Sequence, residues 1–184
     1  MKNLLLLCYF TILLISNSKS LMSQIVICNF VGSSDLKGWV IVNDDVMGGV
    51  SSGNLYLNKD GNGVFEGSIS TDNNGGFSSI RFNSDKILVN SATIIKLKIK
   101  GDGKRYQLRI KSNRDDYHSY VYSFKTSGKL EIITIPLNEM YASFRGRKLK
   151  MQNFNNNYFK QISFLVGNKR DERFKLLIED IILM

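Results

Sequence analysis

The chain has 184 residues, of which 43% are hydrophobic and 22% are charged, and its formal net charge is +9. This is the composition of an ordinary globular protein, and the length suits one domain with a sizeable core. A single proline and 15 glycines exclude a proline-rich linker and a collagen-like chain. Beyond the first two dozen residues, no apolar stretch is long enough to span a bilayer.

Residues 1–23 are predicted to be an export signal. Lys2 precedes an uncharged apolar run from Leu4 to Ile15, and a polar stretch with small residues follows. This order is typical of a signal peptide, with cleavage after Ser20 or after Ser23. A membrane anchor or a buried strand is the alternative, but the run of about 12 residues is short against the ~20 that a spanning helix needs. The sequence therefore predicts a periplasmic or secreted protein whose single domain covers residues 24–184.

Cleavage would also change the cysteine count and the charge. It would remove Cys8, Lys2 and Lys19 and no acidic residue, so the net charge would fall from +9 to +7. Cys28 would then be the one remaining cysteine, which excludes a disulfide or a multi-cysteine metal site within the mature chain. Its apolar neighbours predict an inert thiol in a strand. The remaining positive charge favours anionic partners without naming one.

Downstream of the signal, polar and hydrophobic residues alternate almost everywhere. This periodicity predicts strands over residues 25–31, 39–42, 54–58, 63–70, 77–82, 93–100, 105–111, 117–124, 130–135, 161–166 and 174–182. Only residues 137–144 and the Asn-rich 151–159 could hold a helical turn. About ten strands without alternating helices predict an all-β fold, an antiparallel β-sandwich or jelly roll.

Two neighbouring strands carry a cluster of basic residues. Their inward positions are apolar, and their polar positions hold Lys96, Lys98, Lys100, Arg105, Arg109 and Lys111. Gly101-Asp102-Gly103 between them predicts a tight reversal, so the two strands are expected to form a β-hairpin with a ladder of six cations. This ladder is either a solvated outer face or a surface for an acidic polysaccharide, a lipid headgroup or an acidic protein. Nucleic acid is not expected, because export would prevent the encounter and no binding motif accompanies the charge.

Two segments rich in Asn, Asp and Gly are the most distinctive part of the sequence. Trp39 precedes the first, Asn43–Gly53, and the second is Asn73–Arg81. Asn and Asp side chains hold turns by hydrogen bonding to nearby backbone N–H groups, and glycine permits backbone shapes that other residues resist. We therefore expect two shaped turns, with Trp39 anchoring the first one in the core.

The same segments closely resemble the signature of the complex I intermediate-associated protein 30 family. That signature is a Trp, then Asn-Asp-x-Val-Met-Gly-Gly-Val-Ser, then Asn-Asn-Gly-Gly-Phe-x-Ser-x-Arg. The resemblance continues through Gly101–Tyr106, Phe144–Arg147 and the C-terminal strands. It implies a galactose-binding-like jelly roll, akin to some carbohydrate-binding modules, without catalysis. It also implies a chaperone-like role in assembling respiratory complex I, although export would place this protein away from the matrix-facing arm of that complex.

The signature turns are predicted to be a recognition edge for a protein partner, such as a subunit of a membrane complex. The expected binding residues are Asn43, Asp44, Asp45, Met47, Gly48, Gly49, Asn73, Asn74, Gly75, Gly76, Phe77, Arg81, Arg145 and Arg147. Two guanidinium groups flanking Gly146 could approach a carboxylate or phosphate, or pair with acids such as Glu139.

A sugar-binding face is the rival prediction. Tyr120 and Tyr122, with His118, would form a flat platform beside Lys96, Lys98, Arg105, Arg109 and Lys111, although strand aromatics also serve as core residues.

Catalysis and metal binding have weaker support. His118 is the single histidine, which excludes a site that needs two histidines, so we expect no enzyme; a hydrolase of unknown type is the third hypothesis. Asn43, Asp44, Asp45, Asp60 and Asn62 have calcium-binding chemistry, but ordinary turn chemistry explains them equally well, and no metal or cofactor is predicted. The leading hypothesis is a non-enzymatic, chaperone-like protein-binding domain, and the alternative is an exported carbohydrate-binding module.

Overall fold

A computed structural model of the chain describes residues 24–32 and 35–184, so the predicted export signal lies outside the described residues. Strands dominate this part, with three single 3-10 turns between them. The elements are β1 (Ile25–Asn29), β2 (Trp39–Asn43), η1 (Asp44–Met47), β3 (Ser52–Leu57), β4 (Gly63–Ile69), η2 (Asp72–Asn74), β5 (Ser78–Leu88), β6 (Ile94–Lys100), β7 (Arg105–Lys111), β8 (Ser119–Lys125), β9 (Leu130–Pro136), η3 (Leu137–Glu139), β10 (Tyr141–Phe144), β11 (Arg147–Lys148), β12 (Tyr158–Val166) and β13 (Glu172–Leu183). None of the helical turns in these ranges is long enough to cross a membrane.

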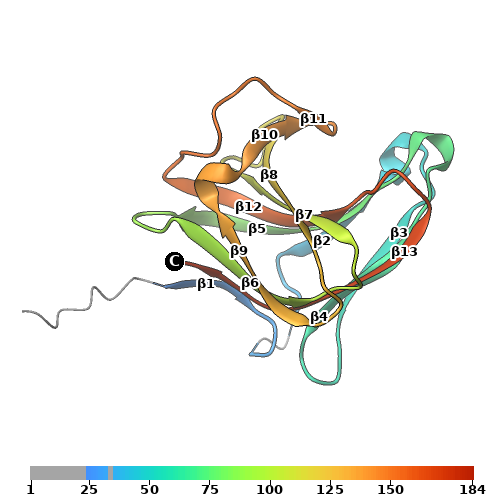
Figure 1. Cartoon of the computed structure of the whole chain (residues 1–184), viewed down its shortest axis with the longest axis horizontal. Helices are drawn as coiled ribbons and strands as arrows, with labels where there is room; N and C mark the ends of the chain where they lie inside the picture. Colours follow the sequence, from blue (N-terminus) through green and yellow to red (C-terminus); the bar gives the residue numbers. More distant parts are fainter. Residues whose placement is uncertain (1–23, 33–34) are drawn as a thin grey trace, which may run out of the picture.

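The strands form two antiparallel sheets that lie face to face (Figure 1). The six-stranded sheet has the order β3-β4-β13-β6-β9, and β1 pairs with β13 beside that path. The seven-stranded sheet has the order β11-β10-β8-β7-β12-β5-β2. The prediction of an all-β antiparallel sandwich is confirmed.

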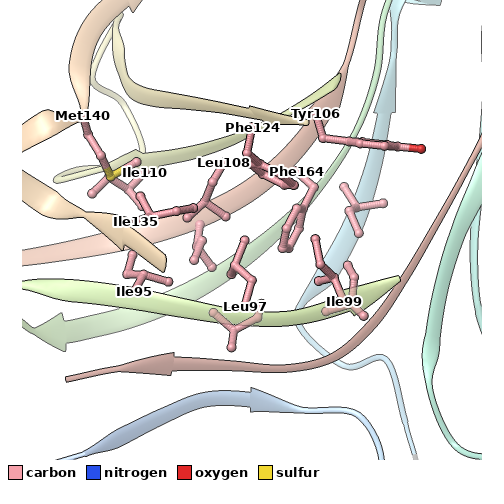
Figure 2. Packing of buried hydrophobic residues seen from close by; sticks show 14 of the residues in the cluster. Ile95, Leu97, Ile99, Tyr106, Leu108, Ile110, Phe124, Ile135, Met140 and Phe164 are labelled. Atoms are coloured by element: carbon pink, nitrogen blue, oxygen red, sulfur yellow. The ribbon is translucent and has the colours of Figure 1, made fainter. Parts of the chain in front are cut away.

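The core lies between the two sheets, and Figure 2 shows side chains from both layers meeting there. Residues Ile95, Leu97 and Ile99 of β6 are fully buried, as are the inward residues of β7. Alternate strand residues point to opposite sheet faces, so each strand presents one apolar face to the core and one polar face to the outside. The inward positions predicted for these two strands are confirmed.

The predicted β-hairpin between these two strands is wrong. In the structure β6 pairs with β13 and β9, whereas β7 pairs with β12 and β8, so the two strands belong to different sheets. Residues 101–103 carry the chain from one sheet to the other. Asp102 holds this crossing because its carboxylate accepts hydrogen bonds from the hydroxyl of Tyr106 at 3.0 Å and from the backbone N–H of Lys175 in β13 at 3.0 Å. Placed in opposite layers, the two apolar faces bury each other, which a hairpin within one sheet would not allow.

The two segments predicted to hold a helical turn have different structures. The 137–144 segment contains the single turn η3 and then continues as β10. The 151–159 segment has no helix, and its end belongs to β12, which begins at Tyr158. The β12 strand therefore begins at Tyr158, earlier than the alternation over residues 161–166 predicts.

Candidate ligand-binding site

The two signature segments meet around the carboxylate of Asp44, which is 1% exposed. Oδ2 of Asp44 accepts hydrogen bonds from the hydroxyl of Ser51 at 2.5 Å and from the backbone N–H groups of Gly76 and Phe77 at 2.6 and 3.1 Å. Oδ1 accepts a fourth from the backbone N–H of Ser51 at 3.0 Å. A charged acceptor forms stronger hydrogen bonds than a neutral one, so this carboxylate fixes the two turns to each other.

These donors also set the ionisation of Asp44. Burial alone would raise the pKa of the carboxyl, but the hydrogen bonds from Ser51, Gly76 and Phe77 stabilise the ionised form and outweigh it. The net effect lowers the pKa of Asp44 below its ordinary value. The carboxylate is therefore a structural anion whose hydrogen-bonding capacity is already used.

The glycines of the signature make room for this carboxylate. A Cβ at Gly49 would lie 2.3 Å from Cγ of Asp44, and a Cβ at Gly75 would lie 2.6 Å from its Oδ2. Both distances are far inside van der Waals contact, so only glycine fits at these positions. A neighbouring hydrogen bond, from the hydroxyl of Ser78 to Oδ1 of Asn43 at 2.7 Å, ties β2 to the start of β5.

Trp39 lies at the start of β2, just before the first turn. Its ring centroid is 5.4 Å from that of Phe30, 5.4 Å from that of Phe82 and 6.5 Å from that of Phe164. The predicted anchoring role of Trp39 is confirmed, because the ring packs against the core cluster.

Most residues of the predicted recognition edge lie where the two signature turns meet around Asp44. Asn43, Asp44, Gly49, Gly75, Gly76 and Phe77 are partly or fully buried, whereas Asp45, Gly48, Asn73 and Asn74 are exposed. The side chain of Met47 is outside the described part. The contacts above are architectural, and binding of a partner at this edge stays a prediction.

Arg81 projects from the other face of β5, away from the core-facing Ile80. The outer face of the seven-stranded sheet is hollowed there by a pocket of about 190 Å³. Arg81 of β5, Arg109 and Lys111 of β7, and Ser163 of β12 line it. The pocket is therefore built mainly on three neighbouring strands of one sheet.

Strand register brings the two arginines together. Ser163 pairs with Arg81 on one side and with Arg109 on the other, so the three residues form one row across the sheet. Adjacent strands lie ~4.8 Å apart, which places the backbones of the two arginines about 10 Å apart with a small serine between them. In the next outward row, Gln161 pairs with Lys111. Long cationic side chains thus surround a floor of short polar ones.

The cations of the pocket lack acidic partners. Burial lowers the pKa of Arg81, and burial together with the nearby Arg81 lowers the pKa of Arg109. The pKa of Lys111 is lowered by burial and by both arginines, against an opposing effect of Asp116 and Asp115. Within residues 24–32 and 35–184, none of the three cations forms an ion pair.

Two aromatic side chains and a further arginine form the rim. The side chains of Tyr117 and Phe144 are 61% and 38% exposed, and their rings meet edge to face with centroids 5.5 Å apart. Arg145 has a left-handed backbone (φ 46°), and its guanidinium lies 5.3 Å from the Phe144 ring centroid. In Figure 1, β10 and β11 rise at the end of the sheet that carries this rim. The pocket therefore combines a polar floor, surrounded by cations, with an exposed aromatic edge.

The sequence placed Arg145 and Arg147 together, but the structure separates them. Arg145 lines the pocket, while Arg147 is exposed on β11 and does not. Among the described residues, neither forms an ion pair with Glu139. Arg145 is thus the member of this pair that can reach a ligand in the pocket.

The predicted ladder of six cations is divided between the two outer faces of the sandwich. Lys96, Lys98 and Lys100 lie on the six-stranded sheet, where Lys98 pairs with Glu179 at 2.5 Å. Arg105 shares the face of Arg109 and Lys111 on β7 but lies at the exposed start of the strand. The single continuous basic surface is therefore wrong, because it depended on the hairpin.

The predicted aromatic platform of His118, Tyr120 and Tyr122 is also wrong. Tyr120 is 7% exposed and packs edge to face on Phe154, and Tyr122 packs against the core. Both ring nitrogens of His118 are buried and have no hydrogen-bond partner among the described residues, and the imidazole lies between the rings of Tyr117 and Tyr120. This strand face points inward, so the core interpretation of these aromatics is the correct one.

The residues suited to calcium do not converge. Asp44 contacts Ser51 at one end of the β3–β4 hairpin, whereas Asp60 and Asn62 lie in the turn at the other end. Asn58 fills that turn by accepting hydrogen bonds from the backbone N–H groups of both. In the described part of the chain, no group of three or more His, Cys, Asp or Glu residues could hold a metal ion.

Sequence reasoning missed several residues of the pocket, including Tyr117, Phe144, Gln161 and Ser163. Gln161 and Ser163 are polar at alternate positions of an apolar strand, which is the ordinary pattern of any strand with one solvated face. Only the register of β12 against the strands of Arg81 and Arg109 shows that these two positions line a pocket. That register cannot be read from a single sequence.

The sequence over residues 28–178 matches the family model of Complex I intermediate-associated protein 30 (CIA30). This match covers most of the chain. The chain belongs to this family. A comparison with curated proteins gives no match for this family member.

Solved structures similar to this family member share its fold. A family 11 carbohydrate-binding module from Clostridium thermocellum, solved in complex with a beta-1,3-1,4-mixed-linked tetrasaccharide, has 17% identity and a TM-score of 0.64, covering 88% of this chain and 95% of the module. A mutant of a family 29 carbohydrate-binding module has 12% identity and a TM-score of 0.52, covering 88% and 91%. At such low identity the likeness establishes the β-sandwich fold alone.

Proposed function

We propose that this chain is an exported, non-catalytic domain that binds carbohydrate on the outer face of its seven-stranded sheet. The observation that carries the proposal is the pocket there, where short polar side chains lie beside exposed Tyr117 and Phe144 rings. Ligand sites combine apolar or aromatic walls with a few placed hydrogen-bonding groups, and a sugar ring presents both an apolar face and hydroxyls. The fold shared with carbohydrate-binding modules supports the same function.

The lining of the pocket supports a role without catalysis. Glycoside hydrolysis ordinarily needs two carboxyl groups flanking the bond to be cut. No Asp or Glu is among the residues that line this pocket in the described chain. His118 lies in a different hollow, packed between tyrosines, and is not available there as a general base.

Isothermal titration of the purified protein with a panel of oligosaccharides tests the proposal. We expect Phe144→Ala and Tyr117→Ala to weaken binding of any saccharide that the intact protein takes. Tyr56→Ala is the matched control, because Tyr56 is an aromatic residue on the six-stranded sheet that does not line the pocket. Absence of binding to every saccharide would overturn the proposal, as would binding that both rim substitutions leave unchanged. Sequencing the N-terminus of the mature protein tests whether the predicted export signal is cleaved.

A protein partner is the second candidate, and family membership favours it. The family model is named for a complex I intermediate-associated protein, and Arg81, Arg109 and Arg145 could take acidic side chains of a partner. Recovery of a defined membrane complex with the intact protein, lost on Arg81→Ala or Arg145→Ala, is the result that this candidate predicts. Recovery that both substitutions leave intact would exclude the pocket as the contact.

A further inference from the structure

The cations around the pocket differ from those elsewhere on the molecule. Five ion pairs join described residues, and they neutralise Lys98, Lys104, Arg114, Arg170 and Lys175. In the cleft beside Gly103, for example, Lys104 pairs with Asp102 at 2.7 Å and Arg170 with Glu172 at 3.0 Å. At the pocket, by contrast, the partly buried Arg81, Arg109 and Lys111 gather without an ion pair to any described residue.

The hydrogen bonds of these cations leave donors aimed at the pocket. Nε of Arg109 donates to Oε1 of Gln107 at 2.9 Å, which orients the guanidinium. Nζ of Lys111 donates to the backbone carbonyl of Asp116 at 2.6 Å. The Arg81 side chain makes no hydrogen bond within the described chain. The terminal N–H groups of both arginines therefore remain for a ligand.

Such an arrangement costs free energy in the empty protein. Burying a cation without a partner is unfavourable, and like charges brought together add to the cost. Burial and mutual proximity lower the pKa values of Arg109 and Lys111, in accordance with this cost. An oxyanion between the cations would remove the penalty and gain charge-assisted hydrogen bonds from two planar guanidinium groups.

We infer that the saccharide is acidic, and that the pocket holds a carboxylate or sulfate group of one sugar residue between Arg81, Arg109 and Lys111. This inference rests on the proposed function, because it concerns the same pocket. A volume of about 190 Å³ is small for a whole ligand and suits one substituted residue of a longer chain. Ser163 and Gln161 would meet its hydroxyls, and Tyr117 and Phe144 would flank its ring.

The test compares matched ligands on the full protein by isothermal titration. The probes are trigalacturonate, a galactose trisaccharide that lacks the carboxylates, and a sulfated galactan trisaccharide. We expect at least one acidic trisaccharide to bind more than about tenfold tighter than the neutral one, with an affinity that falls as salt is added. The acid that binds tells carboxylate from sulfate.

Variants of the cations locate the binding site. Arg81→Gln and Arg109→Gln should each weaken the acidic trisaccharide about 10- to 100-fold, because a charge-assisted contact is lost on either side of Ser163. Arg173→Gln is the matched control, since Arg173 is exposed on the six-stranded sheet, and it should change the affinity less than about twofold. Thermal melting establishes whether each variant folds. If one arginine variant does not fold, the other still tests the site.

The contrary outcomes separate this inference from the proposed function. Equal binding of neutral and acidic trisaccharides, weakened by Phe144→Ala but not by the arginine variants, would overturn the acidic specificity and keep the saccharide site. Binding of a poly-glutamate peptide, lost on Arg81→Gln, without binding of any saccharide would overturn both and favour an acidic protein partner. Binding of none of these probes would also overturn both.

Discussion

Replacing Asp44 by Asn tests whether one buried carboxylate holds the two signature turns together. The amide can keep its oxygen at the position of Oδ2, which accepts three hydrogen bonds, and must then turn its NH₂ group toward the backbone N–H of Ser51. Three charge-assisted bonds become neutral and one buried donor loses its acceptor. At ~1 kcal/mol for each weakened bond and at least ~1 kcal/mol for the orphaned donor, the free energy of unfolding should fall by no less than about 4 kcal/mol.

Urea unfolding followed by the fluorescence of Trp39, the one tryptophan of the chain, measures this loss. In a domain of this size, 1 kcal/mol shifts Tm by ~2–4 °C, so a melting shift of about 8–16 °C should accompany it. Asp72→Asn is the control, because Asp72 is exposed beside the second turn and its substitution removes the same charge. A loss below about 1 kcal/mol, or one equal to that of the control, would refute the role assigned to Asp44.

Other consequences can be measured separately. Gly49→Ala should lower the free energy of unfolding by about 2 kcal/mol, because its Cβ would overlap the Asp44 carboxylate; an unchanged urea midpoint would contradict this. The pKa of Asp44 is depressed in the folded protein, so the stabilisation by its carboxylate is complete above the unfolded value of ~3.9 and is lost as pH falls through the folded pKa. The difference in unfolding free energy between the protein and Asp44→Asn should therefore narrow in acid. A difference that stays constant with pH would contradict this role of the carboxylate. Burial raises the pKa of the Cys28 thiol to about 11 and outweighs a hydrogen bond that lowers it. Iodoacetamide at pH 8 should therefore label Cys28 ~100-fold more slowly in the folded chain than in the unfolded chain, and equal labelling rates would exclude burial of the thiol. Phe144→Ala and Tyr117→Ala should each weaken saccharide binding about tenfold with Tm unchanged, as titration and thermal melting can establish.

The fold could be predicted from the sequence because its determinants are local. Ile95, Leu97 and Ile99 alternate with lysines, and this alternation fixes which side chains face the core whatever the strand pairs with. Pairing is not local. Gly101–Gly103 has the chemistry of a tight turn, but Asp102 bonds to Lys175 of β13, far along the chain, and this contact makes the segment a crossing between sheets.

The candidate site was harder to predict for the same reason. The Asn, Asp and Gly chemistry of the signature predicted shaped turns, and the Asp44 network explains that chemistry as architecture. The sequence predicts both Arg81 and Arg109 as binding residues, but it assigns Arg81 to the signature turns and Arg109 to the basic face. Ser163 joins them into one site, and its position between two strands depends on long-range pairing that a single sequence does not show.

The central claim is that the outer face of the seven-stranded sheet holds the ligand. Amide chemical-shift mapping during titration with an acidic trisaccharide tests this most directly. The account predicts that shifts concentrate on the row of Arg81, Ser163 and Arg109 and on the turn at Phe144. Shifts confined to the Asn43–Gly53 turn or to the lysine face of β6 would contradict it.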